Sequence, residues 1–432
     1  MIRIFNTDEL SVEEILLRID STEAEDNADR VAAEIIKQVR LRGDEAVREY
    51  CQKFDGGAPE SLELDPSVMK EAADRLEETD PELMRILRRA ALNITEFHRH
   101  QMYDGFRMER DGAVLGQRVL PLERVGIYVP GGTASYPSTV LMDCIPARIA
   151  GVREIVMVTP AKNGVVQDKI LAAAFVAGVD RIFAVGGAQA VAALALGTES
   201  FPRVDKIVGP GNVFVAAAKR RVFGMVDIDM IAGPSEILVI ADKDSDPVCL
   251  AADMLSQAEH DKNASAVLIC DSVELAQRVQ AELERQIPLL ERADICRASI
   301  DNNGKIIVAE SLEQAADISN RIAPEHLELC VSKPFELMER IINAGSIFLG
   351  RFAPEALGDY MAGPNHTLPT SGTARFSSPL SVYDFLKRSS YIYYEKHAFN
   401  DICDDVAAFA RTEGLTAHAQ SALSRKSMIE GK

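Results

Sequence analysis

The run VGIYV from Val125 to Val129 is followed by STVLMDCIPARI at residues 138–149 and by EIVMV from Glu154 to Val158. The two outer segments are short and rich in β-branched residues, which favours buried strands. The middle segment is longer and mostly apolar, which favours a helix. A strand, a helix and a second strand in this order are typical of a βαβ unit in a parallel sheet, so this stretch predicts an α/β fold.

The same alternation continues in two successive sets. The first set adds predicted strands at Arg181–Val185 and Lys206–Val208 and helices near 165–178, 188–196 and 212–222. The second set has predicted strands at Ile237–Ala241, Ala266–Cys270, Lys305–Ala309 and Gly345–Leu349, and helices near 246–259, 272–285, 311–322 and 334–344. We therefore predict two doubly wound, incomplete Rossmann-like parallel-sheet domains with small N- and C-terminal helical appendages. Ligands of such sheets bind at the carboxyl ends of the strands, and we expect the same here.

The predicted domain boundaries make one of these domains discontinuous. An N-terminal appendage covers residues 1–22, and residues 23–103 join residues 234–380 in a first α/β domain. Residues 104–233 form the second α/β domain, and residues 381–432 form a C-terminal appendage. Within this appendage Gly414 is expected to end one helix and Thr416 to begin the last.

A helical pattern also extends over about residues 20–110, where two histidines stand close together in the sequence. His98 and His100 are two residues apart, so on a helix they point in different directions and cannot share a ligand. We expect both to face solvent.

Composition excludes several classes of partner. The 432 residues include 47 basic and 66 acidic side chains, a formal net charge of −19, so we expect neither nucleic acid nor an anionic membrane surface as a partner. The longest apolar run, Ile170–Val179, is shorter than the ~20 residues that span a bilayer. The N-terminus brings in acidic residues early, unlike a secretory signal, which predicts a cytoplasmic protein. Seven scattered cysteines without a Cys-x-x-Cys pair indicate reduced, mostly buried thiols.

Two short motifs combine groups that bind metals or transfer protons. Gln257 and His260 are three residues apart in a predicted helix, so both could reach one metal ion, or both could lie on a solvated helix face. Glu325 and His326 stand between a predicted helix and a strand. There the imidazole could take a hydroxyl proton and the carboxylate could activate water, or both could simply face solvent at the helix end.

Two further groups of residues lie in turns and loops. Asp359 and His366 belong to a glycine- and proline-rich segment, where they could be ligands or parts of an ordered surface loop. Three glycine turns, each between a strand and a helix, could hold an anionic ligand on backbone N–H groups, although none has the Gly-x-Gly-x-x-Gly pattern. These turns are Tyr128–Gly132, Gly186–Gln189 and Gly209–Asn212. Ser235, in a similar turn, could present its hydroxyl to a ligand or only cap the structure.

Taken together, these motifs resemble the ordered motif set of the histidinol dehydrogenases. The resemblance covers the chain from about residue 120 to its C-terminus. It rests on the segments Gly126–Gly132, Gly186–Ala190, Gly209–Asn212, Gly233–Glu236, Gln257–His260, Ala323–Leu327, Leu357–Tyr360 and Thr412–His418.

The resemblance implies a role for each candidate residue. It implies a zinc site, one ion per subunit, formed by Gln257, His260, Asp359 and His418. It implies acid/base catalysis by Glu325 and His326, and an NAD site lined by Tyr128, Gln189 and Asn212. It implies that the substrate is held by the four metal ligands and by Ser235, His326, His366 and Glu413.

The implied reaction is the oxidation of L-histidinol to L-histidine through bound L-histidinaldehyde, with two successive hydride transfers to NAD, at the end of histidine biosynthesis. His326 would take the alcohol proton and Glu325 would activate water. The resemblance also implies a homodimer in which the C-terminal appendage carrying Glu413 and His418 completes the partner's site. Two alternatives are a metal-dependent hydrolase with Glu325 as its base and a non-catalytic ligand-binding protein with two lobes.

Overall fold

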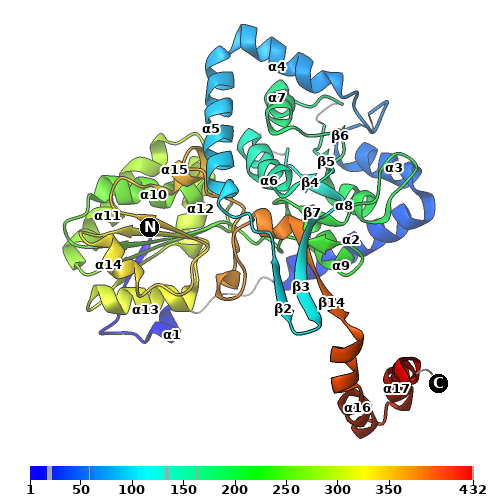
Figure 1. Ribbon diagram of the computed structural model, residues 1–432. Coiled ribbons are helices and arrows are strands. Elements are labelled where there is room, and N and C mark those ends of the chain that lie inside the picture. Colours follow the sequence, from blue (N-terminus) through cyan, green and yellow to red (C-terminus); the bar gives the residue numbers. More distant parts are fainter. Residues whose placement is uncertain (17–21, 58, 132–135, 162–163, 431–432) are drawn as a thin grey trace. The chain divides into compact units, whose positions relative to one another are not determined.

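A computed structural model describes residues 1–16, 22–57, 59–131, 136–161 and 164–430 of the chain (Figure 1). The chain divides into two compact units, one made of residues 1–101 and 122–385 and the other of residues 102–121 and 386–432. Gly132, the last residue of one predicted glycine turn, lies outside the described residues.

The first unit contains a five-stranded parallel sheet in the order β6-β5-β4-β7-β8. Nearly every residue of its three central strands is buried, as expected for a parallel sheet covered on both faces. The strands are β4 (Arg124–Tyr128), β5 (Glu154–Val158), β6 (Arg181–Phe183), β7 (Lys206–Val208) and β8 (Asp227–Ile228). The helices between them are α6 (Pro137–Ala150), α7 (Asp168–Ala177), α8 (Gly187–Leu196) and α9 (Val213–Val222).

The first unit also contains a six-stranded parallel sheet in the order β1-β11-β10-β9-β12-β13. Helices α10, α11 and α12 pack on one of its faces, and α13 and α14 pack on the other (Figure 1). The strands are β1 (Arg3–Asn6), β9 (Glu236–Ala241), β10 (Ser265–Cys270), β11 (Lys305–Val308), β12 (His326–Cys330) and β13 (Ser346–Leu349). The helices are α10 (Pro247–Ala258), α11 (Val273–Gln286), α12 (Ala293–Asn303), α13 (Leu312–Ile322), α14 (Pro334–Met338) and α15 (Glu355–Tyr360).

The two sheets share one topology. In the five-stranded sheet, β4 is the first strand in the chain and lies between β5 and β7. In the six-stranded sheet, β9 is the first strand after β1 and lies between β10 and β12. The strand order therefore reverses beside β4 in one sheet and beside β9 in the other. Such a reversal point leaves a crevice where ligands of open α/β sheets bind. The predicted fold class, two doubly wound parallel sheets with appendages, is confirmed.

The N-terminal segments pack against both sheets. Strand β1 lies within the predicted appendage 1–22 and forms the edge of the six-stranded sheet beside β11. Helices α2 (Thr22–Arg42) and α3 (Asp44–Phe54) pack with α8 and α9 on the five-stranded sheet. The core contacts therefore connect this segment to the five-stranded sheet, although the sequence analysis grouped residues 23–103 with residues 234–380. The domain boundaries themselves stay a prediction.

Two helices, α4 (Ser67–Thr79) and α5 (Pro81–Arg99), follow in the first unit. The expectation that His98 faces solvent is wrong, whereas His100 is exposed. His98 is fully buried, with Nδ1 2.9 Å from the Ile94 carbonyl oxygen. It continues the buried stripe of α5 that also contains Met84 and Leu87, so helix position rather than residue polarity decides its burial.

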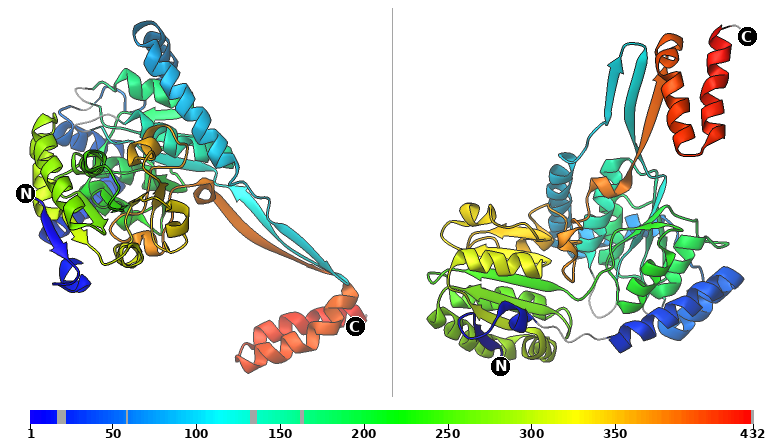
Figure 2. Two further views of the ribbon diagram at one scale, coloured as in Figure 1. Left: turned by 90° about the vertical axis from the view of Figure 1, so that its left-hand side faces the viewer. Right: turned by 90° about the horizontal axis from the view of Figure 1, so that it is seen from below.

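The second unit is an antiparallel ribbon followed by two helices. Its strands lie in the order β14-β3-β2 and are β2 (Phe106–Arg110), β3 (Ala113–Pro121) and β14 (Leu386–Tyr394), which we had not predicted. Both views of Figure 2 show β14 beside β3 and the helices α16 (Lys396–Thr412) and α17 (Thr416–Glu430) packed together. The predicted stop at Gly414, which adopts φ 75°, and the start at Thr416 are confirmed.

Two further observations concern membrane spans and cysteines. None of the helices described is both long and apolar enough to cross a membrane. All seven cysteines are free thiols, and Cys249 alone among them is exposed.

Candidate functional site

The residues predicted to transfer protons lie at the amino ends of the strands next to the reversal point of the six-stranded sheet. His326 is the first residue of β12, and Glu236 is the first residue of β9, the neighbouring strand. These candidate residues therefore do not lie at the carboxyl ends of the strands, where the sequence predicts ligand binding. Helices α10 and α15 each follow a strand and run back along the sheet, which brings Gln257, His260 and Asp359 to the same amino-terminal edge.

Glu325 and His326 are both held by the backbone of Glu236. One oxygen of Glu325, Oε2, accepts a hydrogen bond from the Glu236 N–H at 2.8 Å, and Nδ1 of His326 lies 3.0 Å from the Glu236 carbonyl oxygen. The two side chains approach to 3.6 Å, and both are buried. The alternative that they face solvent at a helix end is excluded.

The contacts of His326 determine its tautomer. Because Nδ1 faces a carbonyl oxygen, Nδ1 carries the proton and donates it. The other nitrogen, Nε2, is buried 4.0 Å from Oδ1 of Asp359 and has no hydrogen-bond partner in the part of the chain that the structure describes. Its lone pair therefore points at the site.

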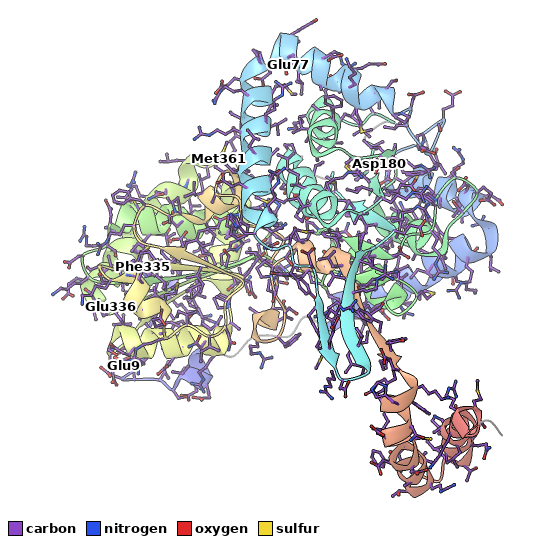
Figure 3. All side chains as sticks on the ribbon, in the orientation of Figure 1. Glu9, Glu77, Asp180, Phe335, Glu336 and Met361 are labelled. Atoms are coloured by element: carbon purple, nitrogen blue, oxygen red, sulfur yellow. The ribbon has the colours of Figure 1, made fainter. Side chains whose placement is uncertain are left out.

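Asp359 lies between two histidines. Its Oδ1 is also 3.6 Å from Nδ1 of His366, whose Nε2 lies 3.3 Å from Thr139 Oγ1 on α6. Burial lowers the pKa of His366 to about 4, so this imidazole is neutral near pH 7. The alternative that residues 359–366 form a plain surface loop is excluded, because the His366 side chain is only 12% exposed and Asp359 lies in the short helix α15. Figure 3 labels Met361 at the end of that helix, where its carbonyl oxygen accepts a hydrogen bond from Asn93 of α5.

Gln257 and His260 approach from α10. Gln257 is 1% exposed, and its buried Oε1 has no hydrogen-bond partner among the described residues. The helix ends at Ala258, one residue earlier than predicted, yet the His260 N–H donates to the Gln257 carbonyl oxygen at 3.1 Å and keeps the three-residue spacing. The alternative of a solvated helix face does not hold for Gln257.

Glu355 is a site residue that the sequence analysis missed. One of its carboxylate oxygens lies within 4.8 Å of ligand atoms of both His326 and Asp359, and Ser256 Oγ donates to its Oε2 at 2.6 Å. Its spacing of four residues from Asp359 places both on one face of α15. The four-residue spacing indicates a shared site only if residues 355–360 are first recognised as a helix within this glycine-rich segment.

The electrostatics of this edge fit a divalent cation. Burial raises the pKa of Glu325 well above its ordinary value, and burial together with Glu355 raises the pKa of Asp359 to about 8. Buried carboxylates repel one another unless a cation offsets their charge. An amide oxygen at Gln257, an imidazole at His260 and a carboxylate at Asp359 form an N/O donor set that suits zinc or a similar ion.

Two of the three residues predicted to bind a dinucleotide, Tyr128 and Asn212, lie at the carboxyl ends of β4 and β7, beside the reversal point of the five-stranded sheet. Tyr128 ends β4, and its buried hydroxyl oxygen accepts a hydrogen bond from the Gly187 N–H at 3.0 Å. Asn212 caps α9 by accepting hydrogen bonds from the N–H groups of Phe214 and Val215, while the side chain stays exposed. Its carboxamide NH2 group therefore remains able to meet a ligand.

Two other candidate residues, Gln189 and Ser235, lie in α8 and just before β9. Gln189 is buried in the first turn of α8, and its Nε2 donates to Asp55 Oδ2 at 3.4 Å. Ser235 is half-buried just before β9, and its carbonyl oxygen accepts a hydrogen bond from Ser265. Glu413 and His418 belong to the second unit, where both are exposed near the junction of α16 and α17.

Comparison with known proteins identifies the family. A family model described as histidinol dehydrogenase matches residues 19–426 of the chain. The chain belongs to the histidinol dehydrogenase family. Like other histidinol dehydrogenases, it is an NAD-dependent oxidoreductase of histidine biosynthesis, as the resemblance of its motifs implied.

Individual histidinol dehydrogenases agree with this assignment over nearly their whole length. The enzyme of Lactococcus lactis is 52% identical over 402 residues, which cover 93% of each chain. That of Pseudomonas putida is 53% identical over 403 residues, covering 92% of this chain and 91% of the relative. The crystal structure of histidinol dehydrogenase from Elizabethkingia anophelis has a TM-score of 0.91 and 33% identity, covering 99% of both chains.

Proposed function

We propose that this chain oxidises L-histidinol to L-histidine through bound L-histidinaldehyde at the amino-terminal edge of the six-stranded sheet. The observation that carries the proposal is the convergence of Glu325 and His326 with Asp359 and His366 in one buried place. These are two proton carriers beside a hard oxygen donor and a second imidazole. The residues at Tyr128, Gln189 and Asn212 would hold NAD.

We propose that a single zinc ion per subunit is held by Gln257, His260, Asp359 and His418 of the partner subunit. The first three bring an amide oxygen, an imidazole and a carboxylate to one edge, and the buried Oε1 of Gln257 has no partner among the described residues. The imidazole and the amino group of the substrate would supply two further donors to the ion. When bound, zinc orients the amino alcohol without changing oxidation state, and NAD accepts the hydride of each oxidation.

His326 is suited to take the proton of the substrate hydroxyl. Its lone pair is on Nε2, and burial lowers the pKa of this imidazole, so it is uncharged near neutral pH. An uncharged imidazole can accept a proton in each of the two oxidations. The bond from Nδ1 to the Glu236 carbonyl oxygen keeps the ring in this tautomer and orientation.

Glu325 is suited to activate the water that adds to the aldehyde. Its raised pKa makes it a stronger base than an exposed glutamate, and the hydrogen bond from the Glu236 N–H fixes its Oε2. Because Glu325 bonds to the N–H and His326 to the carbonyl oxygen of one residue of β9, Glu236, the two side chains are fixed relative to each other. Burial of both groups keeps bulk water from the reactive aldehyde.

We further propose a homodimer with shared sites, in which Glu413 and His418 serve the partner's site and contact its substrate. Both are exposed in the second unit, which is small and made of a three-stranded ribbon and two helices. The sequence-based expectations of a cytoplasmic location and of no nucleic-acid or membrane partner stay predictions.

The test uses metal-loaded protein with limiting L-histidinol and excess NAD, following absorbance of NADH and formation of histidine. We expect two NADH for each histidinol consumed. In Glu325→Gln, the matched variant that keeps side-chain shape, the first NADH should form while the second is strongly slowed. In His326→Gln both should slow.

One NADH per histidinol in the wild-type protein would contradict the second oxidation. Turnover without any NADH would favour the metal-dependent hydrolase, and tight binding of histidinol without any turnover would favour a binding protein. Either result would overturn the proposal.

A further inference from the structure

A buried ion pair stands beside the predicted NAD turn and has no role in the function proposed above. Lys219 on α9 is 2% exposed, and the side chain of its partner Asp229, just after β8, is 1% exposed. Fully buried lysine is rare because removing an ammonium group from water costs several kcal/mol. A buried ion pair does not by itself explain the stability of a fold, because apolar side chains of similar volume at the same positions often stabilise the folded state equally well.

The contacts of the pair converge on a single residue of the turn. Asp229 Oδ2 accepts a hydrogen bond from the Gly209 N–H at 2.7 Å, and Lys219 Nζ donates to the Gly209 carbonyl oxygen at 2.9 Å. The other oxygen of Asp229 pairs with Lys219 and accepts from the Met230 N–H at 2.6 Å. The pair therefore holds both polar backbone groups of Gly209.

Gly209 adopts a conformation that needs such support. Its φ is +112°, a region that L side chains rarely adopt, and a Cβ atom there would overlap the carbonyl oxygen of Tyr128. Asn212 follows three residues later and caps α9, the helix that carries Lys219. The pair thus attaches the Gly209 end of the turn to α9, and the Asn212 cap attaches the other end to the same helix.

A third buried acid adjoins the pair and links it to the substrate side. Asp143 of α6 accepts a hydrogen bond from Thr367 Oγ1 at 2.7 Å, beside His366, and interacts electrostatically with Lys219 and Asp229. Burial raises the pKa of Asp143 to about 8, so at pH 7 it is mostly uncharged. Lys219 is then balanced by Asp229 alone.

From these contacts we infer that Lys219 and Asp229 are positioning residues for the nicotinamide cofactor. They hold the Gly209–Asn212 turn in the conformation that presents the backbone N–H groups of Gly211 and Asn212 and the Asn212 side-chain amide to a dinucleotide. The inference rests on the proposed function, because it takes this turn as the NAD site. Without the pair, the turn must be ordered when NAD binds, which opposes binding.

The test is the double variant Lys219→Met with Asp229→Asn, which removes both charges together and leaves no unpaired charge in the interior. NAD binding to the metal-loaded protein is measured by isothermal titration calorimetry, alongside zinc content and histidinol affinity in the absence of NAD. We expect the Kd for NAD to rise by about tenfold or more, with zinc content and histidinol affinity unchanged. Lys219→Leu with Asp229→Asn, which also leaves no unpaired charge in the interior, serves as the second variant if the first double variant does not fold.

Lys206→Met is the matched control. Lys206 is also buried and forms ion pairs with Asp227 at 3.0 Å and Asp384 at 3.5 Å. It is the first residue of β7, and the turn follows the last residue of that strand. This variant should lose thermal stability yet keep the Kd for NAD within about twofold of wild type.

The outcomes separate the inference from the proposed function. A folded double variant with wild-type NAD affinity, while Asn212→Ala binds NAD weakly, would overturn the inference alone. Equal loss of NAD affinity in Lys206→Met would also overturn it, because the effect would then be general destabilisation. Failure of the wild-type protein to bind NAD, or normal binding by Asn212→Ala, would overturn the NAD site itself.

Discussion

Replacing Asp143 by asparagine should change the pH dependence of stability in a direction that the structure determines. Burial raises the pKa of Asp143 to about 8, against an ordinary value of 3.8 in the unfolded chain. Between these values the folded state holds a proton that the unfolded state has released, so this group's stabilisation is present at low pH and is lost as the pH rises toward 8. Asparagine does not titrate and keeps an acceptor for Thr367.

The magnitude follows from the protons held. One proton bound only by the folded state changes the free energy of unfolding by about 1.4 kcal/mol per pH unit. From pH 5 to pH 7 the stability of Asp143→Asn relative to wild type should therefore rise by about 3 kcal/mol. All other titrating groups are common to both proteins and cancel in the difference.

The assay is denaturant unfolding of wild type and variant at pH 5, 6 and 7. Asp104→Asn, at an exposed position of the second unit, is the control and should give a small difference that does not vary with pH. A difference between Asp143→Asn and wild type that stays constant from pH 5 to pH 7 would refute the reasoning. It would mean that Asp143 is ionised in the folded protein.

Four further results are expected. Removal of zinc with a chelator should abolish NADH formation while the circular dichroism spectrum stays unchanged, because both sheets have apolar cores of their own. Gln257→Leu should lower the amount of bound zinc per chain in metal analysis. Tyr128→Phe removes the acceptor of the Gly187 N–H and should raise the KM for NAD several-fold without changing zinc content, measured by steady-state kinetics. A chain ending before Glu413 should fold, as seen by thermal melting, yet lose activity and tight zinc binding, and full activity would contradict a site shared with His418.

The sequence predicted much of the candidate site because its residues lie in short local motifs. The positions of Glu325 and His326, at the start of β12 after α13, could be read from the order of a helix, a proline and an apolar run. The glycine turn at Gly209 could likewise be read from its place between a strand and a helix. Glu355 could not, because its role depends on a short helix within a segment that reads as a loop and on contacts with Ser256.

The edge of the six-stranded sheet that carries the site was decided by tertiary structure. Ligand binding is expected at the carboxyl ends of strands because the loops that follow the strands lie there. His326 and Glu236, however, are the first residues of their strands. Their side chains meet Asp359 because α15 turns back along the sheet after β13. The local sequence does not determine where a helix that follows one strand ends relative to a neighbouring strand.

The sequence by itself determined the alternation of strands and helices, the family and the residue types available for catalysis, since periodicity and short motifs are local properties of the chain. Tertiary structure alone decided that β1 joins β11, that β14 pairs with β3, that His98 is buried and that Lys219 and Asp229 hold Gly209. Each of these depends on segments far apart in the chain. Burial and hydrogen bonding are set by what a residue meets in space, and a single local pattern is compatible with several such surroundings.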